Sequence, residues 1–182
     1  MLFREPRVLS VVLDVSLRHG NNGKRVLDEV KSDLIKHIRK FDEDDLFYLY
    51  HEQVVDVVER RGEQVHAVAS YQTDGFSFDI NYALKQSLYV AGAEDYDVDK
   101  AVVLITDRMS KLTVNALNKI CMLNEKDGLE CEIFVFNVGA NFDIEEECDF
   151  VLHHCPDKLF EFLQKEFPDG DEDQSEIENL QT

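Results

Sequence analysis

With 182 residues, of which 44% are hydrophobic, the chain can bury one hydrophobic core, and we expect a single domain. Its 38 acidic and 19 basic residues give a formal net charge of −19, which disfavours direct binding to nucleic acid or to an anionic membrane. No apolar run approaches the length of a membrane span, and the first residues lack the layout of a signal peptide. Four cysteines in a chain of this size do not indicate a disulfide framework, so we expect reduced thiols and a cytoplasmic location.

The first half of the chain is expected to contain three strands and two helices. A continuous apolar run at residues 8–13 predicts a strand buried on both faces. Apolar residues at three- and four-residue spacing predict an amphipathic helix over residues 26–38, and a second helix is expected over residues 79–90. Residues 45–50 and 54–58 are predicted strands, and the three residues between them are too few for a crossover, so this pair is expected to be antiparallel.

The second half alternates in the same way. Strands are expected at residues 101–106 and 132–138, with a short edge strand at residues 150–153. Helices are expected at residues 114–123 and 159–167. Buried strands separated by helices predict an α/β fold with a mainly parallel central sheet, one antiparallel edge strand and helices on both faces.

A change of composition near the C-terminus divides the chain into two parts. Residues 1–167 are expected to form the α/β domain. Seven acidic residues and no basic ones occur from position 166 to position 182. Because this stretch has too little apolar content to fold alone, residues 168–182 are predicted to be a disordered acidic tail.

The order of these elements resembles that of von Willebrand factor type A (vWA) domains over approximately residues 7–167. Asp14 and Ser16 follow the first strand as an Asp-x-Ser, and Thr106-Asp107 closes a later buried strand. The resemblance implies a three-layer, Rossmann-like fold with a metal-ion-dependent adhesion site for Mg²⁺ at the carboxyl ends of the strands. It also implies a non-enzymatic protein–protein interaction module, in which the partner often donates a carboxylate to the ion.

Of the five ligand positions that the resemblance implies, the chain keeps three. Asp14 and Ser16 match the first aspartate and the first serine, and Asp107 matches the late aspartate. The threonine position falls at Phe78, with Ser77 beside it, so Ser77 or water would have to complete an oxygen shell for Mg²⁺. Asp14, Ser16, Ser77 and Asp107 are therefore the candidate ligands of a degenerate metal site, and the expected cofactor is either none or Mg²⁺.

Cations stand at two positions of the same site. Arg18 occupies the position of the second serine, and Arg108 follows Asp107 where glycine is common. The Arg18 guanidinium would oppose an ion and could pair with Asp14 or Asp107 instead, or it could point outward. We expect an impaired metal site and a partner-binding surface that includes Arg18, Thr73 and Arg108.

Two other functions are compatible with the sequence. The acidic surface and tail could act as a decoy or DNA mimic that occupies a basic groove on a nucleic-acid-binding protein. Asp14 and Asp107 at neighbouring strand ends also fit a metal-dependent phosphate-ester hydrolase. That chemistry normally needs a second aspartate two residues after the nucleophile, where this chain has Ser16.

A separate group of possible metal ligands lies near the end of the domain, at Cys148, His153, His154 and Cys155. Their spacing does not match the paired ligands of structural zinc sites. Alternation along an extended strand would also send His153 and His154 to opposite faces. We therefore do not expect a zinc site here.

Overall fold

The fold contains six strands and five helices in the part of the chain that the computed structural model describes, namely residues 5–15, 21–51, 54–57, 61–71, 79–94, 98–154 and 156–166. The strands are β1 (Arg7–Asp14), β2 (Leu46–His51), β3 (Val54–Val57), β4 (Asp99–Thr106), β5 (Cys131–Asn137) and β6 (Val151–His153). The helices are α1 (Asn21–Ile38), α2 (Arg61–Ser70), α3 (Ile80–Gly92), α4 (Lys111–Lys126) and α5 (Pro156–Glu166).

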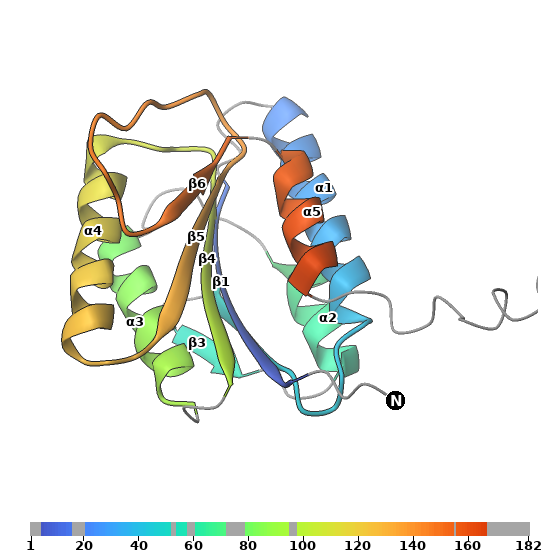
Figure 1. The fold of residues 1–182 in the computed structure, drawn as a ribbon. Coiled ribbons are helices and arrows are strands. Elements are labelled where there is room, and N and C mark those ends of the chain that lie inside the picture. Colours follow the sequence, from blue (N-terminus) through green and yellow to red (C-terminus); the bar gives the residue numbers. More distant parts are fainter. Residues whose placement is uncertain are drawn as a thin grey trace, which may run out of the picture.

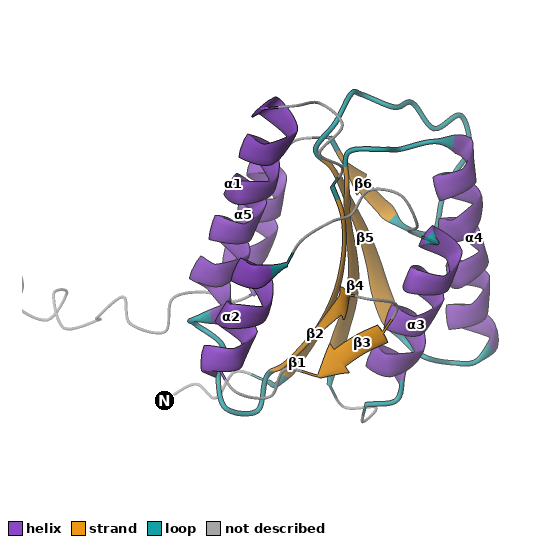
Figure 2. Ribbon diagram, turned by 180° about the vertical axis from the view of Figure 1, so that it is seen from behind, coloured by secondary structure: helices purple, strands orange, loops and turns teal. Residues whose placement is uncertain are grey.

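The strands form one sheet in the order β3-β2-β1-β4-β5-β6. β1 is parallel to both of its neighbours, and β5 is parallel to β4 and β6. At one edge β3 pairs antiparallel with β2, as their short connection predicts. α3 and α4 cover one face, and α1, α2 and α5 cover the other (Figure 1, Figure 2). The expected three-layer α/β architecture with a mainly parallel sheet is confirmed.

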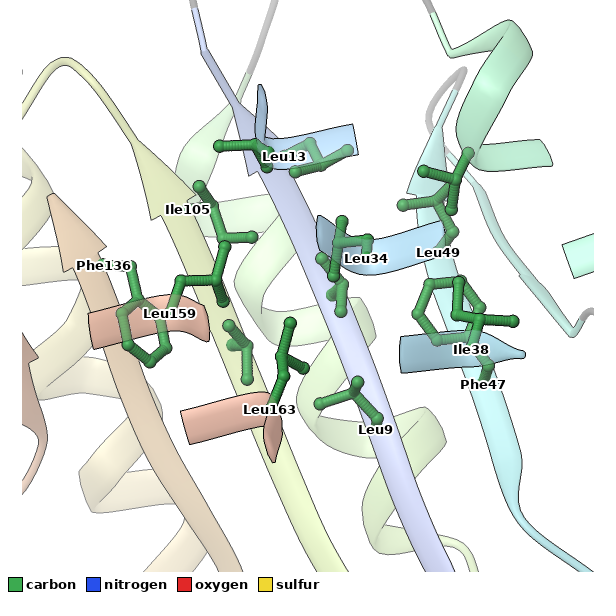
Figure 3. Close-up of a cluster of buried hydrophobic side chains, with 14 of the residues drawn as sticks. Leu9, Leu13, Leu34, Ile38, Phe47, Leu49, Ile105, Phe136, Leu159 and Leu163 are labelled. Atoms are coloured by element: carbon green, nitrogen blue, oxygen red, sulfur yellow. The ribbon is translucent and has the colours of Figure 1, made fainter. Parts of the chain in front are cut away.

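β1 lies at the centre of two hydrophobic cores, one on each face of the sheet. Leu9 and Leu13 belong to the core beneath α1, α2 and α5, where Leu34 and Leu163 also lie (Figure 3). Val12 belongs to the opposite core, beneath α3 and α4. Successive side chains of a strand point to opposite faces, so the continuous apolar run supplies both cores at once. The strand is buried on both faces, as its sequence predicts.

The helices α4 and α5 each begin three residues before their predicted starts, and the main differences from the sequence prediction concern α2 and α1. α2 was not predicted, because its apolar pattern is short: Val68 is fully buried, and the position one turn before it is the buried polar residue Gln64. α1 begins at Asn21, five residues before the first apolar position used to predict it. Both differences concern polar segments, in which apolar residues at helical spacing are too few to predict a helix.

Among the helices in the described ranges, none is both long enough and apolar enough to cross a bilayer. Residues 167–182, which include the predicted acidic tail, lie outside the described residues. The prediction that this tail is disordered therefore stays a prediction.

Candidate functional site

The candidate site lies where β1 and β4 end side by side in the middle of the sheet. The two strands are parallel neighbours, and Asp14 at the end of β1 is in register with Thr106 at the end of β4. The chain goes from β1 to α1 on one face and from β4 to α4 on the other (Figure 1). In open α/β sheets, ligands bind at such a switch point, where the connections diverge from the carboxyl ends of adjacent strands. We call this place the rim and define it by Asp14, Thr106, Asp107 and Arg108.

The Asp14 carboxylate is held by two partners from β4 and the residues that follow it. The guanidinium of Arg108 donates to Oδ1 and forms an ion pair with it. The Thr106 hydroxyl donates to Oδ2 over 3.0 Å, and the backbone N–H of Arg108 donates to the same hydroxyl over 3.0 Å. Both carboxylate oxygens are therefore engaged by side chains of this chain.

Burial has the largest effect on the pKa of the Asp14 carboxyl. Asp14 is only 6% exposed, and its burial raises the pKa of its carboxyl above the ordinary value. The hydrogen bond and positive charge of Arg108 and the hydrogen bond from Thr106 lower the pKa, but less than burial raises it. The neighbouring charge of Asp107 raises the pKa further. Arg108 thus partly offsets the cost of keeping a negative charge inside the protein.

The start of α4 fixes the backbone of Arg108. Ser110 is the N-cap of the helix, and its hydroxyl accepts the backbone N–H of Thr113 over 3.3 Å. The Thr113 hydroxyl donates to the carbonyl of Arg108 over 3.3 Å. The guanidinium is therefore presented from a backbone that is tied to the helix terminus.

A turn after β5 supports the rim from the other side. An added Cβ at Gly139 would lie 2.4 Å from the carbonyl oxygen of Asp107, so only glycine allows this approach. The buried Asn137 side chain accepts the N–H of Gly139 over 3.0 Å and donates to the carbonyl of Ala140 over 2.8 Å. The sequence analysis did not identify Asn137 or Gly139, because their role depends on how β5 lies beside β4.

The structure brings together three of the predicted site residues: Asp14, Asp107 and Arg108. The backbone N–H of Asp107 donates to the carbonyl of Asp14 over 3.4 Å, which keeps the two strand ends adjacent. The other candidates, Ser16, Arg18, Thr73 and Ser77, lie outside the described residues, as does Phe78. Within the described ranges, no group of three or more His, Cys, Asp or Glu side chains is arranged to hold a metal ion.

The possible zinc ligands near β6 have other contacts. His153 stacks on Phe136, with 5.0 Å between the ring centres, and its burial lowers the pKa of its imidazole. A ring nitrogen of His154 lies 3.4 Å from the Asn137 amide nitrogen. Cys148 is a free thiol, and Cys155 lies outside the described residues.

Two further thiols lie in the core beneath α3 and α4. Cys121 and Cys131 are free and buried, and burial raises the pKa of each to about 11. Since the thiolate is the reactive form of cysteine, these two residues are core side chains rather than nucleophiles.

No protein-family model and no curated protein matches the sequence. Solved structures do resemble the fold. Proximal thread matrix protein 1 from the mussel byssus is 12% identical, with a TM-score of 0.60 over 90% of this chain and 47% of that chain. A von Willebrand factor type A protein from Catenulispora acidiphila is 12% identical, with a TM-score of 0.56 over 88% of this chain and 42% of that chain.

The manganese-loaded TRAP protein of Plasmodium vivax is 15% identical, with a TM-score of 0.57 over 90% of this chain and 73% of that chain. The chain thus spans about half the length of the mussel protein and less than half of the Catenulispora protein. At such low identities the similarity concerns the fold and not the activity. The chain has the fold of a von Willebrand factor type A domain.

Proposed function

We propose that the chain is a non-enzymatic protein-interaction module of vWA type that binds its partner through the rim. The fold and the position of the rim at the switch point between β1 and β4 support this proposal. The partner is a protein that presents a carboxylate.

The observation that carries the proposal is the pairing of Arg108 with Asp14. The Asp14 side chain is 8% exposed, whereas that of Arg108 is 28% exposed. A partner that reaches the rim would meet the guanidinium and not the carboxylate beneath it. Guanidinium groups bind carboxylates in a charge-assisted and often bidentate manner, and Arg108 has more donors than its bond to Asp14 uses.

The same pairing does not fit a resident Mg²⁺ ion. An ion at Asp14 would need the carboxylate oxygens that Arg108 and Thr106 already engage, and it would lie next to a positive charge. The proposal is therefore that the metal site is impaired and that Arg108 supplies the positive charge. Isothermal titration with Mg²⁺ and Mn²⁺ is expected to give no binding heat and no change in melting temperature. Saturable binding that Asp14→Asn removes would contradict this part of the proposal.

The environment of Asp14 also argues against a phosphate-ester hydrolase. A carboxylate that is buried, paired with Arg108 and bonded to Thr106 is a poor nucleophile, because both of its oxygens are occupied. A screen of phosphate esters with added Mg²⁺ is expected to show no turnover. Turnover that is lost in Asp14→Asn would instead favour the enzyme.

Binding at the rim is tested with Arg108→Lys and Arg108→Ala. A partner captured by the intact chain is expected to bind Arg108→Ala at least about tenfold more weakly, as for a lost charge-assisted contact. Arg108→Lys should bind with intermediate affinity, because it keeps the charge but not the fork of donors. Arg25→Ala is the matched control, since Arg25 is an exposed arginine that pairs with Glu29 on α1. Equal affinities of Arg108→Ala and Arg25→Ala would overturn the proposal.

A further inference from the structure

A groove of about 600 Å³ runs along α1 beside the end of α2. Lys31, Lys36 and Arg39 of α1 line it, and Asp28 is the single acidic residue among its described lining residues. In a chain with 38 acidic and 19 basic residues, this local excess of positive charge reverses the overall balance. The groove is therefore a surface on which an anionic segment would be attracted and not repelled.

The three cations of the groove differ in what they already bind. Lys31 Nζ donates to the carbonyls of Ala69 and Tyr71, so it holds the C-terminal end of α2 against α1. Burial lowers the pKa of Lys31. Arg39 is exposed, and no carboxylate in the described ranges forms an ion pair with it. Lys36 lies one turn before Arg39; burial raises the pKa of the neighbouring Asp33, and the positive charge of Lys36 acts less strongly to lower it. Lys36 and Arg39 are therefore the cations of the groove that are not bonded to the end of α2.

The groove lies close to the helix from which the acidic segment continues. Phe160 of α5 packs against α1, with Lys36 Nζ 4.7 Å and the His37 ring centre 5.4 Å from the centre of its ring. α5 ends at Glu166, in the same helical layer as α1 and α2 (Figure 2). The segment that follows is thus tethered near the groove. Tethering by a short linker gives an effective concentration in the millimolar range, so even a weak contact would be populated.

The sequence of that segment is complementary to the groove. Residues 169–182 contain six acidic residues and no basic ones. They also contain Ile177 and Leu180, whereas the groove offers the apolar side chains of Ile35 and Ala69 between its cations. We propose that residues 169–182 bind in the groove between α1 and α2 of the same chain, with carboxylates on Lys36 and Arg39. In this way the segment covers this basic groove and competes with any other acidic peptide for it.

The test uses a fluorescent synthetic peptide of residues 167–182 and measures its binding by anisotropy. One protein is the full chain with all six acidic residues of 169–182 changed to Asn or Gln, which leaves the groove uncovered. This chain is expected to bind the peptide at least about tenfold more tightly than the unmodified chain, whose own segment competes. Binding should weaken as salt is raised, because the contacts are exposed ion pairs.

Charge reversal then locates the site. Lys36→Glu with Arg39→Glu, made in the neutralised chain, should abolish peptide binding. Lys85→Glu with Lys119→Glu is the matched control, because these exposed lysines lie on α3 and α4 across the sheet and the net charge changes equally. Melting temperatures of all variants verify that they fold.

Three results would overturn the inference. The first is a neutralised chain that does not bind the peptide, and the second is equal loss of binding in the two charge-reversal variants. The third is a difference in peptide affinity between the unmodified and the neutralised chain that disappears when the protein is diluted. Such a result would mean that the segment binds the groove of a second copy and not that of its own chain.

Discussion

Removal of the Arg108 side-chain charge should expose the cost of burying Asp14. In Arg108→Met, the Asp14 carboxylate keeps only its bond from Thr106 while remaining buried. Breaking a buried ion pair from one side costs about 3–5 kcal/mol, and the partial exposure of Arg108 reduces this to about 2 kcal/mol. The protein can limit the loss by protonating Asp14. Keeping a carboxyl with the ordinary pKa of 3.8 protonated at neutral pH costs about 4 kcal/mol. The loss of folding stability in Arg108→Met cannot exceed this value, because protonation of Asp14 is always available as an alternative.

The pH dependence distinguishes this mechanism from a loss of packing. The pKa of Asp14 is raised in the folded state, so the folded protein binds a proton more tightly than the unfolded one. Stability contributed by this group is present below its unfolded pKa and falls as pH rises through the folded pKa. Loss of Arg108 moves the folded pKa higher still. The destabilisation should therefore be about 2 kcal/mol at neutral pH and less than about 1 kcal/mol near pH 4.5.

Thermal unfolding followed by circular dichroism measures this directly. For a domain of this size the neutral-pH loss corresponds to a decrease in melting temperature of about 4–8 °C. Asp14→Asn is the control, since it removes the charge and keeps an acceptor for Thr106. In that background Arg108→Met should cost much less, so the double-mutant cycle yields a large coupling energy. An equal loss at both pH values, with no coupling to Asp14, would refute the reasoning.

Two other predictions concern the turn after β5 and the buried thiols. Gly139→Ala should lower the free energy of unfolding by about 2 kcal/mol, because the added Cβ would collide with the Asp107 carbonyl. At Gly128 an added Cβ meets open space, so Gly128→Ala should lower the free energy of unfolding by only about 1 kcal/mol, through the strain of an alanine at positive φ. Urea unfolding compares them, and equal losses would contradict the collision. At neutral pH Cys131 should react with maleimide at least about a hundredfold more slowly than the partly exposed Cys148. Mass spectrometry of the labelled peptides gives both rates, and similar rates would mean that the core opens readily.

The sheet could be predicted from the sequence because its strands are buried on both faces. A short, continuous apolar run such as residues 8–13 favours a central strand, because every one of its side chains must be buried. The structure confirms this, since β1 contributes side chains to a hydrophobic core on each face of the sheet. α2 could not be predicted in this way. It buries Val68 but also the polar Gln64, so its packing against α1 depends on contacts that periodicity does not record.

The sequence predicted which acidic residues of the candidate site lie at the ends of strands. Asp14 and Asp107 follow apolar runs, and parallel neighbours bring their ends to the same edge of the sheet. Which arginine reaches Asp14 could not be derived, because that depends on the path of the loops. From the sequence, Arg18 could pair with Asp14 or Asp107 or point outward. The structure shows Arg108 in contact with Asp14, and Arg18 lies outside the described residues. The hydrogen bond from Thr106 likewise depends on the register of β1 and β4.

A guanidinium at the rim would make binding depend on conditions differently from a metal ion. A bound ion can be lost to a chelator, whereas Arg108 is covalently attached to the chain. If the proposed function holds, the affinity for the partner should be unchanged by EDTA. It should weaken as salt screens the contact between Arg108 and the partner's carboxylate.

Arg108 is also bonded to Asp14, so a partner binds a guanidinium that is already oriented. Binding then costs less side-chain entropy than binding to a free arginine would. Asp14→Asn should then weaken partner binding without removing any group that the partner touches, because it releases Arg108 from that orientation. Surface plasmon resonance of Asp14→Asn beside Arg108→Ala measures this, and unchanged affinity in Asp14→Asn would show that the pair serves stability alone.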